Sequence, residues 1–245
     1  MKRRLALAVL AGWILVAAYG ALAGAVPIGV RYSPELGHFL VGEGEMTLYL
    51  FTPDQPGVST CYEACARIWP PLLVDSPDDL EVPGNLPGTF DVTQRADGTL
   101  QVTYNGIPLY YWIADNEPGD TTGHGVDDVW FVVHPAPTVR AADHPDHGRI
   151  LVDALGMTLY RFANDEENVS NCSGTCAINW PPLILSYGEP TLEPGIDGEL
   201  GWITRGDGAR QVTYNGMPLY GWINDQQPGD ATGHGVGGNW FVINP

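Results

Sequence analysis

The strongest constraint on the fold is an internal repeat, which divides most of the 245-residue chain into two similar halves. The segment Gln-Val-Thr-Tyr-Asn-Gly occurs at residues 101–106 and again at 211–216, and Trp-Pro-Pro-Leu occurs at 69–72 and at 180–183. Each half divides again into two units, in which Leu-Tyr is followed at fixed distances by an aromatic residue, an Asp and a Trp. Repetition at fixed spacing indicates a repeated structural unit, so we expect four copies of one motif.

Twelve residues define this motif, with a Tyr, an Asp and a Trp in each copy. The Asp lies five residues after the Tyr, and the Trp lies twenty residues after it. The four sets are Tyr49, Asp54 and Trp69; Tyr110, Asp115 and Trp130; Tyr160, Asp165 and Trp180; and Tyr220, Asp225 and Trp240. Because equal spacing requires equal chain paths, we expect these residues to occupy equivalent structural positions in the four units.

This pattern resembles a bacterial secreted-repeat family described as predicted lipoproteins with a Yx(FWY)xxD motif. The segments 49–54, 110–115, 160–165 and 220–225 all satisfy that motif, and the resemblance covers nearly all of residues 38–245. The family has no established activity, so the resemblance implies no catalytic residues. The Cys that carries the lipid in a lipoprotein is missing, so we expect this chain to be secreted or held at the cell in another way.

The spacing of strand and turn signals predicts three short strands in each unit. A strand candidate precedes each motif Tyr, as at 101–103, and the Asn-Gly pairs at 105–106 and 215–216 are strong hairpin signals. The chain contains 31 Gly and 21 Pro, well above average usage, which suits short strands joined by many turns. The sequence therefore predicts an all-β protein with two tandem halves, arranged like a small propeller or as two packed antiparallel sheet domains.

The N-terminus has the pattern of a targeting segment. Three basic residues at 2–4 precede an apolar run that ends in small residues near Ala25, which is typical of a cleaved signal peptide at 1–25. The run is also long enough to span a bilayer, so an uncleaved N-terminal anchor is the alternative. Either interpretation places the rest outside the cytoplasm, whether secreted, periplasmic or at the cell surface. The other expected segments are an N-terminal extension at 26–37, the first half at 38–135, a linker at 136–148 and the second half at 149–245.

The charge of the chain limits its partners. The formal net charge is -18, and three of the 11 basic residues lie in the N-terminal segment. Phosphate backbones and anionic membrane surfaces would repel such a body, so we expect no nucleic-acid partner and membrane contact only through an uncleaved N-terminus. Cations and cationic partners are compatible with this charge, although the sequence does not identify a partner.

The four cysteines form two C-x3-C pairs, Cys61 with Cys65 and Cys172 with Cys176. In a helical turn this spacing brings two Cα atoms within reach of a disulfide, and an extracytoplasmic location allows the bond to persist. The sequence therefore predicts two local disulfides. The spacing fits neither haem attachment nor a zinc site, whereas a redox-active role remains an alternative because small disulfide loops can be reducible.

Two equivalent Gly-His-Gly segments supply the candidate metal ligands. His124 and His234 occupy these segments, and Asp120 and Asp230 precede them closely. Histidine beside carboxylate suits a transition metal, so these four residues are candidate ligands for a metal ion of unspecified identity. The simpler interpretation is a tight Gly loop with a hydrogen-bonded His and with Asp side chains that form turns. No other cofactor is expected.

The sequence gives no reason to expect catalysis. It contains no nucleophile motif, phosphate-binding loop or triad, and no carboxylate pair with an acid and a base role. Our first hypothesis is a non-catalytic extracytoplasmic repeat protein that binds a ligand or associates with the cell envelope. A metal-binding or thiol-redox carrier and an enzyme acting on polysaccharide are the alternatives. A ligand would be expected on the loops at 115–125 and 225–235.

Overall fold

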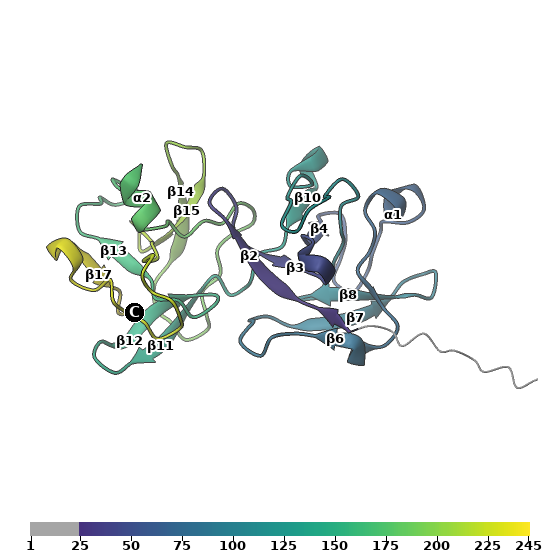
Figure 1. Cartoon of the computed structure of the whole chain (residues 1–245), viewed down its shortest axis with the longest axis horizontal. Coiled ribbons are helices and arrows are strands. Elements are labelled where there is room, and N and C mark those ends of the chain that lie inside the picture. The colour runs from purple at the N-terminus through teal and green to yellow at the C-terminus, as the bar shows by residue number, and fades with distance from the viewer. Residues whose placement is uncertain (1–24) are drawn as a thin grey trace, which may run out of the picture.

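The computed structural model describes residues 25–245, which form two lobes side by side along the long axis of the molecule (Figure 1). We call residues 25–135 half 1 and residues 136–245 half 2. The predicted signal peptide at 1–25 lies, apart from Ala25, outside the described residues. Among residues 25–245, no helix is long and apolar enough to cross a membrane.

Short strands dominate both halves. In half 1 they are β1 (Val26–Pro27), β2 (Gly29–Ser33), β3 (Gly37–Val41), β4 (Tyr49–Phe51), β5 (Leu73–Val74), β6 (Leu80–Glu81), β7 (Phe90–Gln94), β8 (Leu100–Tyr104), β9 (Ile107–Pro108) and β10 (Trp130–Val132). In half 2 they are β11 (Val139–His144), β12 (Gly148–Asp153), β13 (Tyr160–Phe162), β14 (Leu200–Thr204), β15 (Arg210–Tyr214), β16 (Met217–Pro218) and β17 (Trp240–Val242). The helices are α1 (Ala64–Ile68) and α2 (Thr175–Asn179), with 3-10 turns at Glu43–Glu45, Pro77–Asp79, Val126–Asp128 and Val236–Gly238. The protein is therefore all-β, as the sequence predicts.

The strands pair into small sheets, and the two halves use the same pairings. In half 1, β8 pairs with β7 and β9, and β10 pairs with β4, all antiparallel. Half 2 repeats this arrangement with β14, β15 and β16 and with the pair β13 and β17. Within residues 25–245 the sheets close into neither a barrel nor a propeller.

The Asn-Gly turns join β8 to β9 and β15 to β16. Asn105 and Gly106 have φ angles of 48° and 84°, and Asn215 and Gly216 have φ angles of 49° and 79°. Positive φ at both central residues is the requirement of a type I′ turn, whose twist matches that of antiparallel strands. These turns therefore fix the register that brings Tyr110 and Tyr220 into the core of each half.

The expected third strand begins directly at the motif Trp in two of the four units. After Trp130 and Trp240 the chain continues as β10 and β17, but Trp69 and Trp180 directly follow α1 and α2. Each of the latter two Trp residues precedes two prolines. Since proline has no N–H to donate to a strand ladder, pairing begins only after the two prolines. In half 1 it begins with β5, which pairs with β8, and in half 2 it is reduced to a bridge between Ile184 and Gln211.

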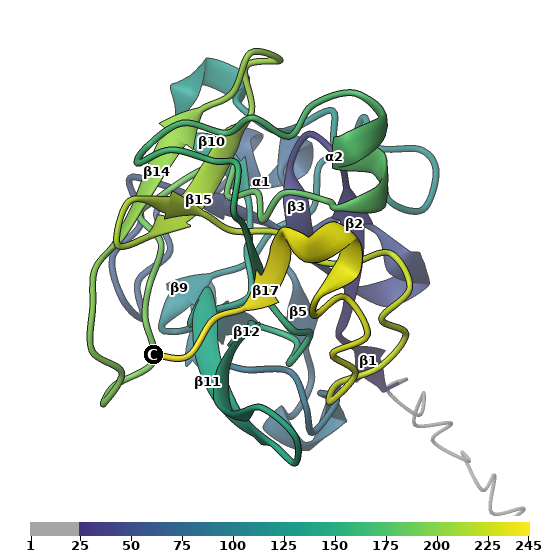
Figure 2. The same ribbon diagram turned by 90° about the vertical axis from the view of Figure 1, so that its left-hand side faces the viewer.

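The segments expected as an extension at 26–37 and as a linker at 136–148 instead belong to the fold. β2 pairs with β3 over five residue pairs, and β11 pairs with β12 over six. Most residues of β2 and β11 are half-buried or exposed, so their sequences lack the alternation that marks a strand. Each half therefore includes an equivalent N-terminal hairpin, and Figure 2 shows β11 and β12 at the opposite end of half 2 from α2.

A stack of four aromatic rings lies at the centre of each half. In half 1 the order is Phe51, Trp130, Trp69 and Trp112, with centroid distances of 4.2, 3.9 and 4.1 Å. In half 2 the equivalent rings are Phe162, Trp240, Trp180 and Trp222, at 4.2, 3.8 and 4.0 Å. All four motif Trp side chains are buried. Stacked aromatic pairs stabilise a core by about 0.5–1.5 kcal/mol beyond the burial of their area.

Each half also contains a second apolar cluster, against its three-stranded ladder. In half 1 this cluster is built on the fully buried Leu40, Leu48, Val102 and Leu109. In half 2 the corresponding cluster is built on Leu151, Leu159, Val212 and Leu219. Each half therefore buries a core of its own, which agrees with a tandem arrangement of two repeats of the same fold.

The first Gly of each Gly-His-Gly segment packs directly against the aromatic stack. A Cβ atom on Gly123 would lie 2.8 Å from Trp69 Cη2 and 2.9 Å from Tyr49 Cζ. Gly233 approaches the rings of Trp180 and Tyr160 equally closely. Because a side chain does not fit at these distances, the repeated glycine is required for packing of the core.

We predict that Gly123→Ala lowers the free energy of unfolding by about 1–3 kcal/mol, because the added methyl group overpacks the Trp69 and Tyr49 contact. Urea denaturation followed by Trp fluorescence measures this loss. Gly206→Ala is the matched control, since its Cβ would meet no atom within 4 Å and the equivalent residue of half 1 is Ala96. Equal losses for the two variants would contradict the packing role of Gly123.

Candidate functional site

The motif Tyr and Asp residues bind each other across the two units of a half. The Tyr49 hydroxyl donates to Asp115 Oδ2 at 2.7 Å, and the Tyr110 hydroxyl donates to Asp54 Oδ2 at 2.6 Å. In half 2 the equivalent bonds join Tyr160 to Asp225 at 2.6 Å and Tyr220 to Asp165 at 2.7 Å. Each Tyr therefore bonds to the Asp of the other unit, and the two backbones also pair at these tyrosines, as between Tyr49 and Tyr110.

The second oxygen of each motif Asp closes the loop that follows it. Asp54 Oδ1 accepts from both the N–H and the hydroxyl of Thr60, each at 2.7 Å. Asp115 Oδ1 accepts from the N–H of Thr122 at 3.0 Å and from its hydroxyl at 2.6 Å. Asp225 makes the same two bonds with Thr232, and Asp165 accepts from the N–H of Asn171. Both carboxylate oxygens are thus engaged, which makes these residues part of the scaffold.

Burial keeps the motif phenols protonated. It raises the pKa of Tyr49 far above its ordinary value, and the hydrogen bond to the Asp115 carboxylate raises it further. Burial and the Asp54 hydrogen bond act in the same direction on the pKa of Tyr110, and the tyrosines of half 2 have the same environment. These phenols therefore act as neutral hydrogen-bond donors, and a role as base or nucleophile would require an ionised form that burial disfavours.

The structure does not assemble the candidate metal ligands into a metal site. Nδ1 of His124 accepts from the N–H of Val132 at 3.3 Å, and His234 makes the equivalent bond to Val242. Asp120 Oδ2 accepts from the N–H groups of Asn116 and Glu117, and Asp230 makes the same turn with Gln226 and Gln227. In the part of the chain described, no group of three or more His, Cys, Asp or Glu side chains is placed to hold a metal ion.

Three histidines of half 2 stack on one another, a contact that the sequence did not indicate. The His147 ring lies 4.7 Å from His144 and 4.3 Å from His234, with interplanar angles of 27° and 29°. Desolvation, together with the two neighbouring rings, lowers the pKa of His147. Stacked rings face each other rather than aiming nitrogens at a shared point, so the contact packs the β11–β12 turn against the 233–235 loop.

The two predicted disulfides are confirmed, and both are local. Cys61 bonds to Cys65 with a Cα–Cα distance of 5.3 Å, and Cys172 bonds to Cys176 at 5.2 Å. Each joins the loop after a motif Asp to the first turn of α1 or α2. The described residues contain no free cysteine. The disulfides thus hold the short helices in place beside the aromatic stacks.

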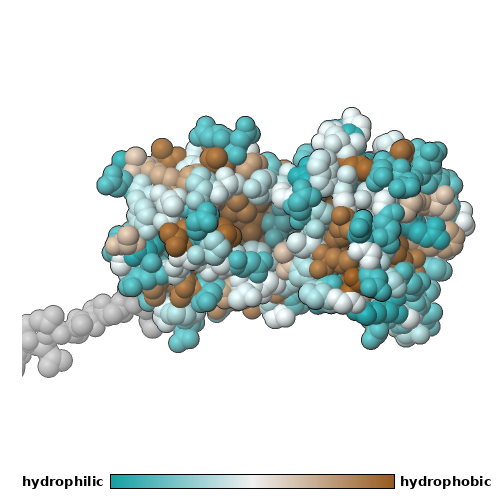
Figure 3. Space-filling view, turned by 180° about the vertical axis from the view of Figure 1, so that it is seen from behind, coloured by the Kyte–Doolittle hydropathy of each residue, from teal (hydrophilic) through white to brown (hydrophobic). Residues whose placement is uncertain are grey.

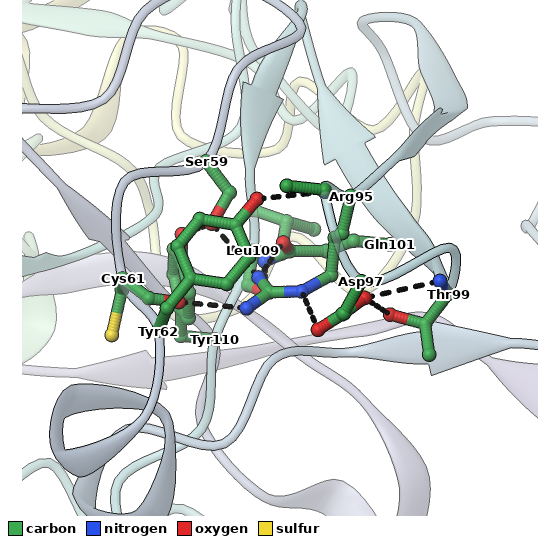
Figure 4. A network of polar contacts seen from close by, with 10 residues as sticks. Ser59, Cys61, Tyr62, Arg95, Asp97, Thr99, Gln101, Leu109 and Tyr110 are labelled. Atoms are coloured by element: carbon green, nitrogen blue, oxygen red, sulfur yellow. Dashed lines mark hydrogen bonds and ion pairs between the residues drawn. The ribbon is translucent and has the colours of Figure 1, made fainter.

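A buried arginine organises the chain next to each disulfide (Figure 4). Arg95 Nη1 donates to Ser59 Oγ at 2.8 Å and to Gln101 Oε1 at 2.5 Å, and Nη2 donates to the carbonyl of Cys61 at 2.7 Å. The Tyr62 ring lies over the guanidinium, 4.3 Å from Arg95 Cζ. This network was not predicted from the sequence, although an Arg six residues before the Gln of the repeated Gln-Val-Thr segment occurs in both halves.

The two halves contact each other through an aromatic stack and through hydrogen bonds of a buried histidine. Phe131 of half 1 stacks on Tyr187 of half 2 at 3.8 Å. His134, from half 1, bonds through Nδ1 to the carbonyl of His38 and through Nε2 to Ser186 Oγ, both at 2.7 Å. Burial lowers the pKa of His134 to about 4, so the ring is neutral at physiological pH. The residue thus links the halves without adding a charge.

A cleft of about 200 Å³ opens beside this contact. Its walls combine Leu50, Ile107 and Val132 of half 1 with Leu185 and Tyr187 of half 2. Glu189 and Asn105, both exposed, also line it. In the view from behind, Figure 3 shows apolar residues in patches on both lobes, including the region where the lobes meet. The cleft is therefore a concave, mainly apolar site to which both halves contribute.

A family model that matches all four units identifies the family. A family model described as a secreted repeat of unknown function matches residues 31–73, 91–134, 141–184 and 201–244. The chain belongs to this secreted-repeat family. No curated protein and no solved structure matches the chain. The family description and the disulfides support an extracytoplasmic repeat protein, because disulfides persist in oxidising compartments.

The environment of His134 predicts a loss of stability in acid. Its pKa is near 4 in the folded protein and near 6.5 when unfolded, so the unfolded chain binds the proton more readily. This contribution to stability is complete above pH 6.5 and is lost as the pH falls towards 4. We expect His134→Gln to show a smaller decrease in unfolding free energy between pH 7 and 5 than the wild type, measured by urea denaturation.

His144→Gln serves as the control for this pH dependence, because His144 lies on the β11–β12 hairpin, away from the contact between the halves. The control should keep the wild-type slope. A wild-type slope in His134→Gln would show that protonation of this ring does not govern the acid response.

Proposed function

We propose that this protein is a non-catalytic binding protein of the cell exterior, which takes a small, neutral and mainly apolar ligand in the cleft between its halves. The observation that carries the proposal is the cleft itself, where apolar side chains from both halves line a concave space of about 200 Å³. Clefts of this kind, at the boundary between two folded units, are favoured positions for ligand sites in proteins.

The lining favours an apolar ligand with one or two polar atoms. Leu50, Ile107, Val132 and Leu185 offer aliphatic surface, and the Tyr187 ring offers a flat wall. The hydroxyl and main-chain groups at Thr138 and Thr191 provide polar atoms at one side, where Thr138 N–H bonds to Thr191 Oγ1 at 3.1 Å. A few polar groups among apolar walls orient a ligand, while the walls supply most of the binding free energy.

Charge and size narrow the ligand class further. The His134 ring is neutral because of its low pKa. Glu189, the charged residue of the lining, is paired with Arg210 at 3.8 Å, so the cleft offers no uncompensated positive charge to an anionic ligand. The net charge of -18 also repels anionic ligands at long range. An engineered cavity of about 150 Å³ holds benzene, so a space of this size suits a molecule of about one or two rings.

The hydrogen bonds of the motif residues support a non-catalytic function. The four motif carboxylates accept hydrogen bonds on both oxygens, and the four motif phenols are buried donors. A general acid or base must exchange its proton with a substrate, which these internally paired groups do not reach. The repeated residues therefore stabilise the fold, and the ligand binds in the cleft between the halves.

A neutral fluorescent probe tests the proposal. We expect 6-propionyl-2-dimethylaminonaphthalene, a neutral probe with two fused rings, to bind the wild-type protein saturably, with its fluorescence rising in the apolar cleft. Ile107→Trp should weaken binding at least about tenfold, because the larger ring fills the cleft; a tenfold change corresponds to about 1.4 kcal/mol. Ile113→Trp is the matched control, since Ile113 is 62% exposed and does not line the cleft. Probe binding that is absent from the wild type, or unchanged by Ile107→Trp, would contradict the proposal.

A further inference from the structure

The surroundings of the buried arginine differ between the halves in one respect. Arg205 of half 2 repeats the bonds of Arg95: Nη1 donates to Ser170 Oγ at 2.9 Å and to Gln211 Oε1 at 2.6 Å, and Nη2 donates to the carbonyl of Cys172 at 2.8 Å. These distances match those of half 1 within 0.1 Å. The hydrogen bonds therefore hold the guanidinium in the same orientation in both halves.

In half 1 a tyrosine from the same chain covers this face. Tyr62 follows the first Cys of its pair, and its ring stacks 4.3 Å from Arg95 Cζ. The Tyr62 hydroxyl also accepts a hydrogen bond from the N–H of Ala96 at 3.0 Å. Ring and hydroxyl thus make two separate contacts, one with the cation and one with the main chain, as the sticks in Figure 4 show for the ring.

Half 2 lacks this cover. The residue after the first Cys is Ser173, whose side chain has no ring to lay over Arg205. Gly206 takes the place of Ala96, and among residues 25–245 no side chain or carbonyl accepts a hydrogen bond from its N–H. A second closing contact of half 1, from Thr93 Oγ1 to the carbonyl of Gly57, has no counterpart because Ile203 has no hydroxyl.

A polar cleft of about 570 Å³ lies where the ring would be. We call it the tyrosine socket and define it by Cys172, Ser173, Gly174, Arg205, Gly206 and Asp207. None of these residues lines the cleft between the halves, so the two sites are separate. The Arg205 side chain is 5% exposed, compared with 1% for the covered Arg95. The socket thus offers the small exposed part of a fixed guanidinium and an N–H donor in the arrangement that half 1 uses to hold a phenol.

We propose that the tyrosine socket binds the tyrosine side chain of another polypeptide. The incoming ring stacks on the Arg205 guanidinium, and its hydroxyl accepts from the Gly206 N–H, as Tyr62 does in half 1. Stacking of a cation on an aromatic face and a hydrogen bond to the hydroxyl together distinguish tyrosine from other side chains.

The size of the socket favours a tyrosine that is part of a polypeptide. A cavity of about 150 Å³ is enough for a single benzene ring, so the socket has room for main chain on both sides of the tyrosine. In half 1 the bound ring also belongs to a polypeptide segment, because Tyr62 lies within the disulfide loop. This site goes beyond the proposed function, since its ligand and its residues differ from those of the cleft between the halves.

The test follows the Gly206 amide by nuclear magnetic resonance while a ligand is added. N-acetyl-tyrosinamide should shift this resonance saturably in the wild type. N-acetyl-phenylalaninamide, which lacks the hydroxyl, should bind at least about fivefold more weakly. Ser173→Tyr should abolish the response, because it supplies the ring that half 1 contains, and Ser173→Ala is the matched control that should retain it.

Tyr62→Ser provides the reciprocal experiment. This variant opens an equivalent socket in half 1, so the Ala96 amide should respond to N-acetyl-tyrosinamide only in the variant. The proposal is overturned if the wild-type Gly206 amide does not respond to the tyrosine probe, or if Ser173→Tyr leaves the response unchanged. Binding of p-cresol without binding of N-acetyl-tyrosinamide would also overturn it, since that result assigns the socket to free phenols.

Discussion

The exchange of hydrogen bonds between tyrosines and aspartates is the interaction on which the rest of the structure depends. Tyr49 bonds to Asp115 and Tyr110 bonds to Asp54, so neither unit of half 1 can satisfy its buried polar groups alone. Leaving a buried carboxylate or hydroxyl unpaired costs more free energy than its hydrogen bond contributes. The two units of a half therefore have to fold together. The same exchange in half 2 makes the half, and not the unit, the smallest complete structure. The disulfides, loops and aromatic stacks are arranged around these pairs.

Local sequence signals predicted much of this structure. The Asn-Gly turns, the strands before each motif Tyr and the two local disulfides follow from rules that act over a few residues. Contacts between distant residues could not be predicted in this way. Equal spacing shows that the tyrosines are equivalent, but it does not show that Tyr49 bonds to Asp115 rather than to Asp54. The stack of His147 on His234 and the pairing of β11 with β12 were missed for the same reason. The candidate site had even less sequence signal, because its lining residues come from both halves.

Repetition and difference have separate roles in this protein. The residues that the units share are engaged in hydrogen bonds and packing inside each half. Gly123, which recurs as Gly233, likewise packs against Trp69. Surfaces available to a ligand lie between the halves or where a repeated position has changed, as from Tyr62 to Ser173. A duplicated half can lose an internal contact and still fold, since its Arg205 network remains complete. Duplication thus gives one stable scaffold two different sets of surface groups.

The most direct test of this account is a double-mutant cycle on the exchanged pair. Tyr49→Phe and Asp115→Asn, singly and together, give the coupling energy between the two side chains from their unfolding free energies in urea. Residues in direct contact couple by about 0.5–3 kcal/mol, and the account predicts a value in this range for Tyr49 with Asp115. The same cycle for Tyr49 with Asp54, which belong to one unit, should give a clearly smaller coupling. Equal or larger coupling within the unit would contradict the claim that the units are held together by exchange.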